Sequence, residues 1–298
     1  FSLIYFLWTR PMAVPKSNQI VRLFSVTSQN PDDTFSYPEY LELNNDASAF
    51  EALVARGGRG TQIPNPDGTS ELHTVNVVSD NFFHVLGIRP VLGRVFTPGD
   101  KDLLNQEPVA VLGNSFWKGR YGGDPGIIGK HIEFQRGAQR VLFTVLGVLP
   151  QTFRDINNGE DRDIWLPTQS WLHLSSRDDL DNRGFRWFRI LGRLAPGVSV
   201  SAANAQVEVI ARRLASEWPA TNRGRSARVI SDLSYRLKLA GANGIVLLAA
   251  VLLLVLLSSV NVANLLLARG ARRSREIAVR LSLGADRWRI VYQLMTEN

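Results

Sequence analysis

The chain has 298 residues, of which 45% are hydrophobic and 20% are charged, and its net charge is +7. It contains no cysteine, which excludes disulfide scaffolds, thiolate zinc sites and cysteine nucleophiles. The excess positive charge lies beside an apolar run near the C-terminus, and no nucleic-acid-binding motif accompanies it. We therefore expect no nucleic-acid partner and attribute the arginines to the flank of a membrane span.

The N-terminal segment is apolar and short. Its first eight residues, Phe1 to Trp8, span about 12 Å as a helix, less than the bilayer core of about 30 Å. The positively charged start of a signal peptide is absent. We expect residues 1–9 to be the end of a transmembrane helix, with an N-terminal strand as the alternative.

Residues 10–238 carry the strand and helix signals of a mixed α and β domain. Four helices are predicted from local signals. Pro38 suits the first turn of a helix at Tyr37–Leu43. Ser79 and Gly87 can cap and end a helix at Asp80–Leu86, and Asn114 and Gly122 flank Ser115–Tyr121 in the same way. The helix Val200–Trp218 is predicted from one apolar face and from Pro219 after its end. Strands are predicted in short segments rich in Val, Ile, Phe and Leu: Gln19–Thr27, Leu72–Ser79, Val109–Gly113, Lys130–Gln135, Val141–Val148, Trp187–Leu194 and Arg228–Leu233.

The order of these elements predicts an α+β fold with two lobes. Strand–helix–strand passages at residues 18–79 and 187–233 form one lobe from both ends of the segment. Between them, residues 108–167 are mostly predicted strands and include a hairpin with its turn at Arg136-Gly137. We expect this middle part to be an inserted β-rich lobe.

The large domain lacks a recognisable catalytic or ligand-binding motif. Gly123-Asp-Pro-Gly-Ile-Ile-Gly129-Lys130-His131 is similar to a phosphate-binding loop, but the glycine spacing is wrong and His131 replaces the Ser or Thr that holds magnesium. We interpret it as a loop that leads into a strand, and Arg56-Gly-Gly-Arg-Gly60 as a flexible turn. The four histidines have no ligand spacing. We expect no catalytic residue, cofactor or metal site.

A transmembrane helix is predicted at residues 239–268, where thirty consecutive residues carry no formal charge. Between Gly244 and Leu267, sixteen residues are Leu, Ile or Val. At about −0.4 kcal/mol each they contribute about −6 kcal/mol to the free energy of insertion. This gain is larger than the cost of inserting the two asparagines in the run. A helix of this length spans about 35 Å, enough for a bilayer. The uncharged length disfavours the alternative, a buried helix of a soluble protein.

Within this span, Ser258, Asn261 and Asn264 recur every three residues and form a polar stripe. In lipid such a stripe is satisfied by partner helices, whereas serine also bonds to its own helix backbone. We predict that the stripe packs against other helices rather than against acyl chains.

Residues 269–298 follow the span and contain seven arginines and three acids. Arginine next to a span is typical of the cytoplasmic side. Glu276 and Arg280 form an i,i+4 pair, Gly284 is a helix stop and Asp286 can cap a new helix. The segment predicts a helix, a tight corner and a second amphipathic helix at the membrane surface.

This C-terminal stretch resembles the MacB/FtsX family of ABC transporter permeases. The resemblance rests on Arg275-Glu-Ile-Ala-Val-Arg280, Leu283-Gly-Ala285, Arg287 and Gln293 to Glu297. It extends upstream to Arg10-Pro11, Phe116-Trp117, Tyr121-Gly-Gly-Asp-Pro125, Ile128-Gly129, Val145-Leu-Gly-Val-Leu-Pro150 and Leu194-Ala-Pro-Gly-Val198. Nearly the whole chain is covered.

The resemblance implies a permease subunit in the bacterial inner membrane, with residues 10–238 as a periplasmic domain that has a porter-like lobe and an inserted lobe. It implies a cytoplasmic ABC ATPase subunit or domain as partner, pairing with a second permease copy, contact with membrane lipid, and a periplasmic adaptor. ATP hydrolysis is expected from the ATPase and not from this chain. The residues at the corner that meets the ATPase are Arg275, Glu276, Arg280, Gly284, Ala285 and Arg287.

Two other functional classes compete with this interpretation. A membrane-anchored extracytoplasmic sensor shares the topology, but a signalling linker sustains heptads, which Gly284-Ala-Asp286 interrupts. A tethered enzyme lacks a convergent set of catalytic groups here. Within the permease interpretation, export of drugs or peptides, lipoprotein extraction and control of a cell-wall hydrolase all stay open.

Overall fold

The computed structural model describes residues 14–65, 67–153, 164–282 and 288. The residues predicted to end a transmembrane helix, 1–9, lie outside this range. The chain divides into two compact units, a large domain that extends to Leu237 and a second unit that begins at Lys238.

The elements of the chain alternate between strand and helix. The strands are β1 (Ile20–Val26), β2 (Phe50–Pro64), β3 (Ser70–Val78), β4 (Leu92–Gly93), β5 (Val109–Leu112), β6 (His131–Arg136), β7 (Gln139–Val148), β8 (Ile164–Pro167), β9 (Arg189–Leu194) and β10 (Ser226–Ser231). The α-helices are α2 (Tyr37–Asp46), α3 (Phe82–Leu86), α4 (Lys101–Gln106), α5 (Asn114–Tyr121), α6 (Thr168–Trp171), α7 (Asp178–Asp181), α8 (Val200–Glu217), α9 (Pro219–Asn222) and α10 (Asp232–Ser282). Short 3₁₀ turns lie at η1 (Ser17–Gln19), η2 (Pro98–Asp100) and η3 (Pro125–Ile127).

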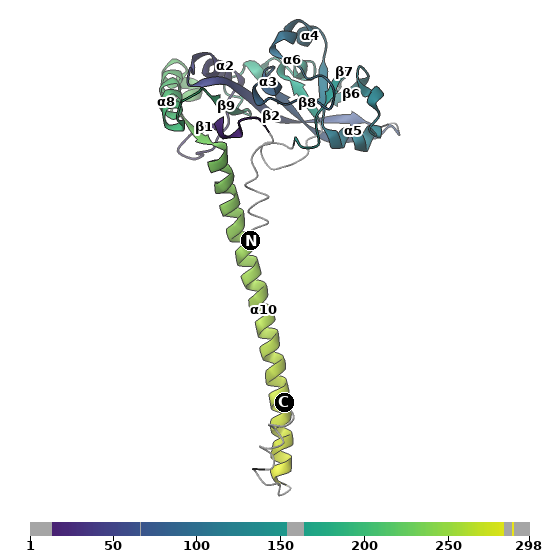
Figure 1. Ribbon diagram of the computed structural model, residues 1–298, viewed down its shortest axis with the longest axis vertical. Helices are drawn as coiled ribbons and strands as arrows, with labels where there is room; N and C mark the ends of the chain where they lie inside the picture. The colour runs from purple at the N-terminus through teal and green to yellow at the C-terminus, as the bar shows by residue number, and fades with distance from the viewer. Residues whose placement is uncertain (1–13, 66, 154–163, 283–287, 289–298) are drawn as a thin grey trace. The chain divides into compact units, whose positions relative to one another are not determined.

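The described strands form one sheet in the order β10-β1-β9-β2-β3-β8-β5-β7-β4, and β6 pairs with both β2 and β7. Strands from both ends of the domain therefore lie together with α2 and α8, while the middle strands form a ring, β2-β3-β8-β5-β7-β6, that the pair Gln62–Gln135 closes. Figure 1 shows the first group at one end of the domain and β6, β7 and α5 at the other. The predicted α+β fold with an inserted β-rich lobe is confirmed.

The long strand β2 joins the two lobes, because its first half pairs with β9 and its second half pairs with β3. The prediction of a flexible turn at Arg56–Gly60 is wrong, since these residues lie in the middle of β2. At Gly57 a Cβ atom would lie 2.2 Å from Cε3 of Trp187. This glycine serves close packing of an indole on a strand rather than a turn.

Around the first half of β2 both faces of the sheet are covered, so successive residues of this strand enter different cores. In β2, Leu53 and Ala55 face one cluster and Val54 faces the other. The first cluster includes residues of α2 and α8, among them Tyr40 and Leu43 on α2, and Ala203, Val207, Ile210 and Leu214 on α8. The second includes Phe82, Phe83 and Leu86 of α3 with Trp165 of β8. Burial on both faces explains the apolar strands that the sequence shows.

The predicted helices form with small differences at their ends. α2 begins with a capping box between Ser36 and Glu39, and Ser199 caps α8. Ser79 does not cap α3, because its hydroxyl donates to Oδ1 of Asn81 and accepts from the Ala55 N–H. The strand predicted at Arg228–Leu233 ends at Ser231, since α10 begins at the next residue.

Two glycine substitutions in this domain are expected to act in opposite directions. A Cβ at Gly147 in β7 would lie 2.2 Å from the Arg94 carbonyl oxygen, whereas one at Gly119 in α5 meets nothing within 4 Å. Gly147→Ala should therefore lower the free energy of unfolding by about 1–3 kcal/mol, and Gly119→Ala should raise it by about 0.5–1 kcal/mol. Urea unfolding of both variants measures the difference, and equal stabilities would contradict it.

Candidate functional site

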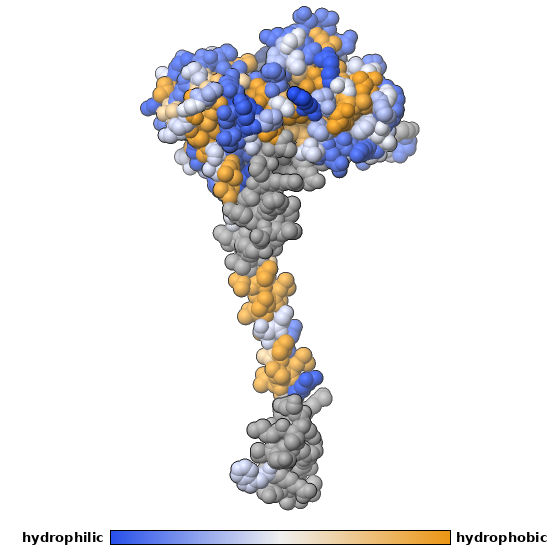
Figure 2. Space-filling model, in the orientation of Figure 1, coloured by the Kyte–Doolittle hydropathy of each residue, from blue (hydrophilic) through white to orange (hydrophobic). Residues whose placement is uncertain are grey.

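The second unit contains an apolar stretch of α10 that is long enough to cross a membrane. Ala249–Arg269 has 21 residues and a mean hydropathy of 2.3, and none of its apolar window is buried against the rest of the described chain. At 1.5 Å per residue it spans about 31 Å, close to the bilayer core. Leu252, Leu253 and Leu254 are each at least 60% exposed. Figure 2 shows hydrophobic residues along this part of α10, a surface of the kind that contacts lipid or other helices.

The predicted polar stripe lies on this stretch. Ser258, Asn261 and Asn264 are all exposed on α10. The neighbouring Ser259 donates its hydroxyl to the Val255 carbonyl at 2.8 Å, which is the type of backbone bond that is the alternative for Ser258. Packing of the stripe against partner helices stays a prediction.

A buried ion pair holds the first turn of α10 to the large domain. Nε of Arg22 on β1 donates to Oδ1 of Asp232 at 2.7 Å, and Nε of Arg236 donates to Oδ2 at 2.6 Å. The Arg22 and Asp232 side chains are 5% and 6% exposed. Because both carboxylate oxygens are used, Asp232 fixes the start of the helix relative to the strand.

Further contacts surround this ion pair. The Arg22 guanidinium lies 4.4 Å from the centre of the Tyr235 ring, and Tyr235 packs against Phe24. The Ser231 hydroxyl accepts from the Ser234 N–H, as an N-cap does. Burial lowers the pKa of the Arg22 guanidinium, and the adjacent Asp232 carboxylate opposes that shift. We call Arg22, Asp232, Tyr235 and Arg236 the helix anchor.

The helix anchor was not predictable from the sequence. Arg22 and Asp232 are 210 positions apart, so no local pattern connects them. One signal was present, since Arg22 is the single charge between Ile20-Val21 and Leu23-Phe24 in an apolar strand. A buried charge in such a position needs an oppositely charged partner. Only the pairing of β1 with β10, which sets Val21 opposite Ser231, brings Asp232 close to Arg22.

The predicted ATPase-coupling residues are only partly within the described chain. Arg275, Glu276 and Arg280 lie in α10, which continues past the apolar stretch to Ser282. Gly284, Ala285 and Arg287 lie outside the described residues. The predicted corner and the second helix stay predictions.

In the large domain, the loop at residues 123–131, which is similar to a phosphate-binding loop, is held by contacts among its own residues. Asp124 accepts from the Gly126 N–H at 2.8 Å and pairs with Lys130 at 2.9 Å, and β6 starts at His131. The prediction of a loop that leads into a strand is confirmed. Among residues 14–65, 67–153 and 164–282, no three His, Cys, Asp or Glu side chains cluster as a metal site would require.

Comparison with protein families matches nearly the whole chain. Residues 6–210 match the MacB-like periplasmic core domain, and residues 248–298 match the FtsX-like permease C-terminal region. Curated relatives include the macrolide export ATP-binding/permease protein MacB of Neisseria meningitidis and that of Neisseria gonorrhoeae. Each is 23% identical over 246 residues, which cover 82% of this chain and 35% of the relative. The match thus spans about a third of the relatives' length.

Solved structures with a similar fold include the periplasmic region of MacB from Actinobacillus actinomycetemcomitans, with a TM-score of 0.52 and 15% identity over 74% of this chain and 92% of that chain. A domain of a putative permease from Porphyromonas gingivalis gives a TM-score of 0.51 and 17% identity, over 72% of this chain and 90% of that chain. At these identities the comparison supports the fold of the large domain.

Proposed function

This chain belongs to the MacB/FtsX family of ABC transporter permeases, and from this premise we propose that it couples ATP hydrolysis in a cytoplasmic ABC ATPase to movement of its large domain. The large domain lies in the periplasm and α10 crosses the inner membrane. Movement of the domain drives efflux of a substrate or its extraction from the membrane.

The observation that carries the proposal is the continuity of α10. One helix runs from Asp232, in the helix anchor, through the apolar stretch to Arg280 and Ser282 (Figure 1). A helix transmits an axial displacement because each turn is hydrogen bonded to the next. ATP binding at the inner end would shift the segment around Arg275, and the helix would pass that shift to β1 through Asp232.

The partners follow from the same proposal. An ABC ATPase, fused or separate, contacts Arg275, Glu276, Arg280, Gly284, Ala285 and Arg287. Ser258, Asn261 and Asn264 pack against helices of a second permease copy or of the same permease, and lipid covers the remaining apolar face. A periplasmic adaptor contacts the large domain. The relatives' name refers to macrolide export, so efflux is the first transport activity to test.

The coupling corner is tested at Gly284 in the intact transporter. A β-branched residue is strained at a glycine helix stop, so Gly284→Val should displace the corner from the ATPase. We expect ATP hydrolysis to continue while transport into inverted membrane vesicles falls by about tenfold or more. Leu281→Val, a nearby apolar exchange, serves as the matched control. If transport and ATPase activity fall in equal proportion, Gly284 is not part of the coupling corner. The same conclusion follows if neither activity changes.

A second measurement distinguishes the proposed permease from the competing sensor function. A permease should co-purify with an ABC ATPase and stimulate its ATP hydrolysis, whereas a sensor should not. The family assignment favours the permease, and no feature of the described residues favours the sensor.

A further inference from the structure

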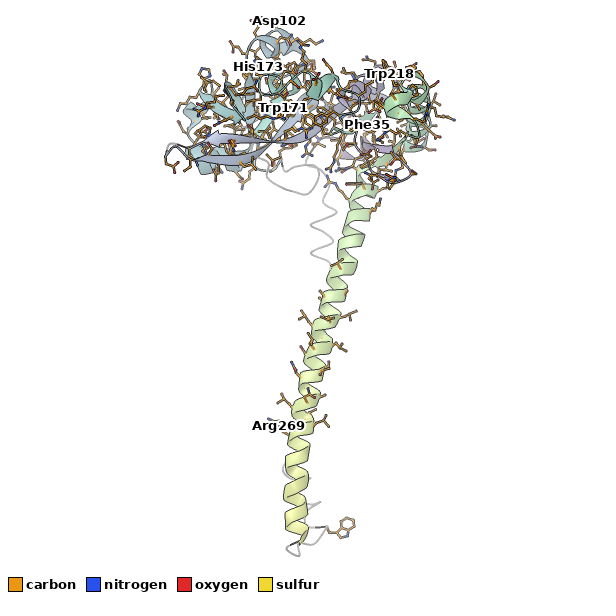
Figure 3. The ribbon with its side chains drawn as sticks, turned by 180° about the vertical axis from the view of Figure 1, so that it is seen from behind. Phe35, Asp102, Trp171, His173, Trp218 and Arg269 are labelled. Carbon is orange, nitrogen blue, oxygen red and sulfur yellow. The ribbon has the colours of Figure 1, made fainter. Side chains whose placement is uncertain are left out.

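A gap in the sheet lies along β2, where the two lobes meet. Pairing with β9 ends at Arg56–Arg189, and pairing with β6 occurs only at Gln62–Gln135. On this edge, Gly57 to Thr61 have no strand partner among the described residues. The chain before β9 turns away from β2 here, because Phe188 pairs with Phe35 instead. Phe35 is labelled in Figure 3.

The main-chain groups at the gap belong to glycines. Ala55 bonds to Ser79 at the end of β3, so the odd-numbered residues of β2 direct their N–H and C=O groups toward β3. The even-numbered residues Gly58 and Gly60 therefore direct theirs toward the gap. Both glycines are exposed, and neither has a side chain that would obstruct an approaching strand.

A cavity of about 470 Å³ lies at this gap, and its charged side chains are all arginines: Arg56, Arg59 and Arg189. The Arg59 guanidinium lies 4.0 Å from the ring centre of Trp187 and 4.6 Å from that of Phe185. Its Nε and Nη2 atoms are buried and have no hydrogen-bond partner among the described residues. Unpaired guanidinium donors in such a site favour an anionic ligand.

The other two arginines add to this positive field. Arg189 is exposed and forms no ion pair within the part of the chain that the structure describes. Arg56 is 5% exposed and donates from Nε to Asn76. Asp179, which interacts with Arg59 electrostatically, is already paired with Arg136 at 3.1 Å. The described lining of the cavity therefore carries positive charge without an acidic residue.

We propose that this gap binds an extended, acidic segment of another polypeptide. The segment adds to β2 as a short strand that pairs with Gly58 and Gly60, and its carboxylates contact Arg59 and Arg189. Strand addition uses the main-chain groups for affinity and the flanking side chains for specificity. A small anion would use the arginines alone and leave the glycine edge unpaired. This inference does not depend on the proposed transport function.

The test measures peptide binding to the full chain in detergent micelles. The probe is a fluorescein-labelled peptide, Glu-Val-Glu-Val-Glu, followed by fluorescence anisotropy at low ionic strength, and its lysine counterpart is the negative control. We expect saturable binding of the acidic peptide, which Arg189→Gln weakens about tenfold. Arg212→Gln is the matched control, because Arg212 is exposed on α8 away from the gap. It should change the affinity by less than about twofold.

Two further probes separate strand addition from simple attraction between charges. Peptides with the same sequence are N-methylated at alternate residues, in the two complementary patterns. Only one pattern removes the N–H groups that pair with β2, so we expect one methylated peptide to lose binding and the other to keep it. Binding that survives both patterns, or that Arg189→Gln leaves intact, overturns the proposal. Displacement of the peptide by an equal concentration of inorganic phosphate indicates a simple anion site and overturns it as well.

Discussion

Replacing Asp232 by alanine is expected to lower the free energy of unfolding of the large domain by about 3–5 kcal/mol. The substitution removes the counter-ion of Arg22, whose side chain is 5% exposed and cannot be rehydrated without opening the structure. Arg236 is less affected, because its side chain is 18% exposed. Urea unfolding of the detergent-solubilised chain, followed by tryptophan fluorescence, measures the loss.

The exposed ion pair between Asp46 and Arg213 provides the matched control. It lies in the same domain, but its side chains are 38% and 45% exposed. Asp46→Ala should therefore change the stability by less than about 1 kcal/mol. Adding Arg22→Met to Asp232→Ala removes the buried charge itself, so the double variant should lose less than the sum of the two single variants. A loss for Asp232→Ala no larger than that for Asp46→Ala would contradict the structural role of the helix anchor.

Proline at Ala242 is expected to reduce transport by about tenfold or more while ATP hydrolysis continues. Ala242 lies inside α10, between the helix anchor and the apolar stretch. Proline there removes one main-chain hydrogen bond and clashes with the carbonyl one turn earlier, at a cost of about 3 kcal/mol. If α10 transmits the displacement, a kink at this position should absorb it. Parallel assays of ATP hydrolysis and transport on the intact transporter measure the separation.

Gly241→Ala tests the same segment in the opposite direction. A Cβ at Gly241 meets nothing within 4 Å, so alanine should stabilise the helix by about 0.5–1 kcal/mol without a steric cost. Transport should then be preserved. If Ala242→Pro transports like the unmodified protein, then α10 is not the element that carries the displacement, although the family assignment would stand.

The elements with a strong local signal were predictable. The helix α8 begins at the predicted residue because Ser199 caps it and four apolar residues line one face. The hairpin of β6 and β7 forms at the predicted turn, where Gly137 has φ 61°. The apolar stretch of α10 was evident from hydropathy alone. These features depend on interactions between residues close in the sequence.

The strand β2 was missed because its glycines suggested a turn. A glycine lacks both strand propensity and a side chain, so its sequence neighbourhood does not reveal that Trp187 packs on Gly57. The same cause hid the gap at Gly58 and Gly60, which exists only because β9 and β6 meet β2 at different positions. Neither feature has a periodic pattern.

The sequence by itself determined that a mixed α and β domain is joined to an apolar helix and a basic segment, and it indicated the permease family. Hydrophobic transfer, helix capping and charge next to a span act over a few residues, so their free energies follow from composition and spacing. Only the tertiary structure decided that Asp232 meets Arg22 and that three arginines converge on two glycines. Those contacts join residues far apart in the chain, and the register of the sheet alone brings them together.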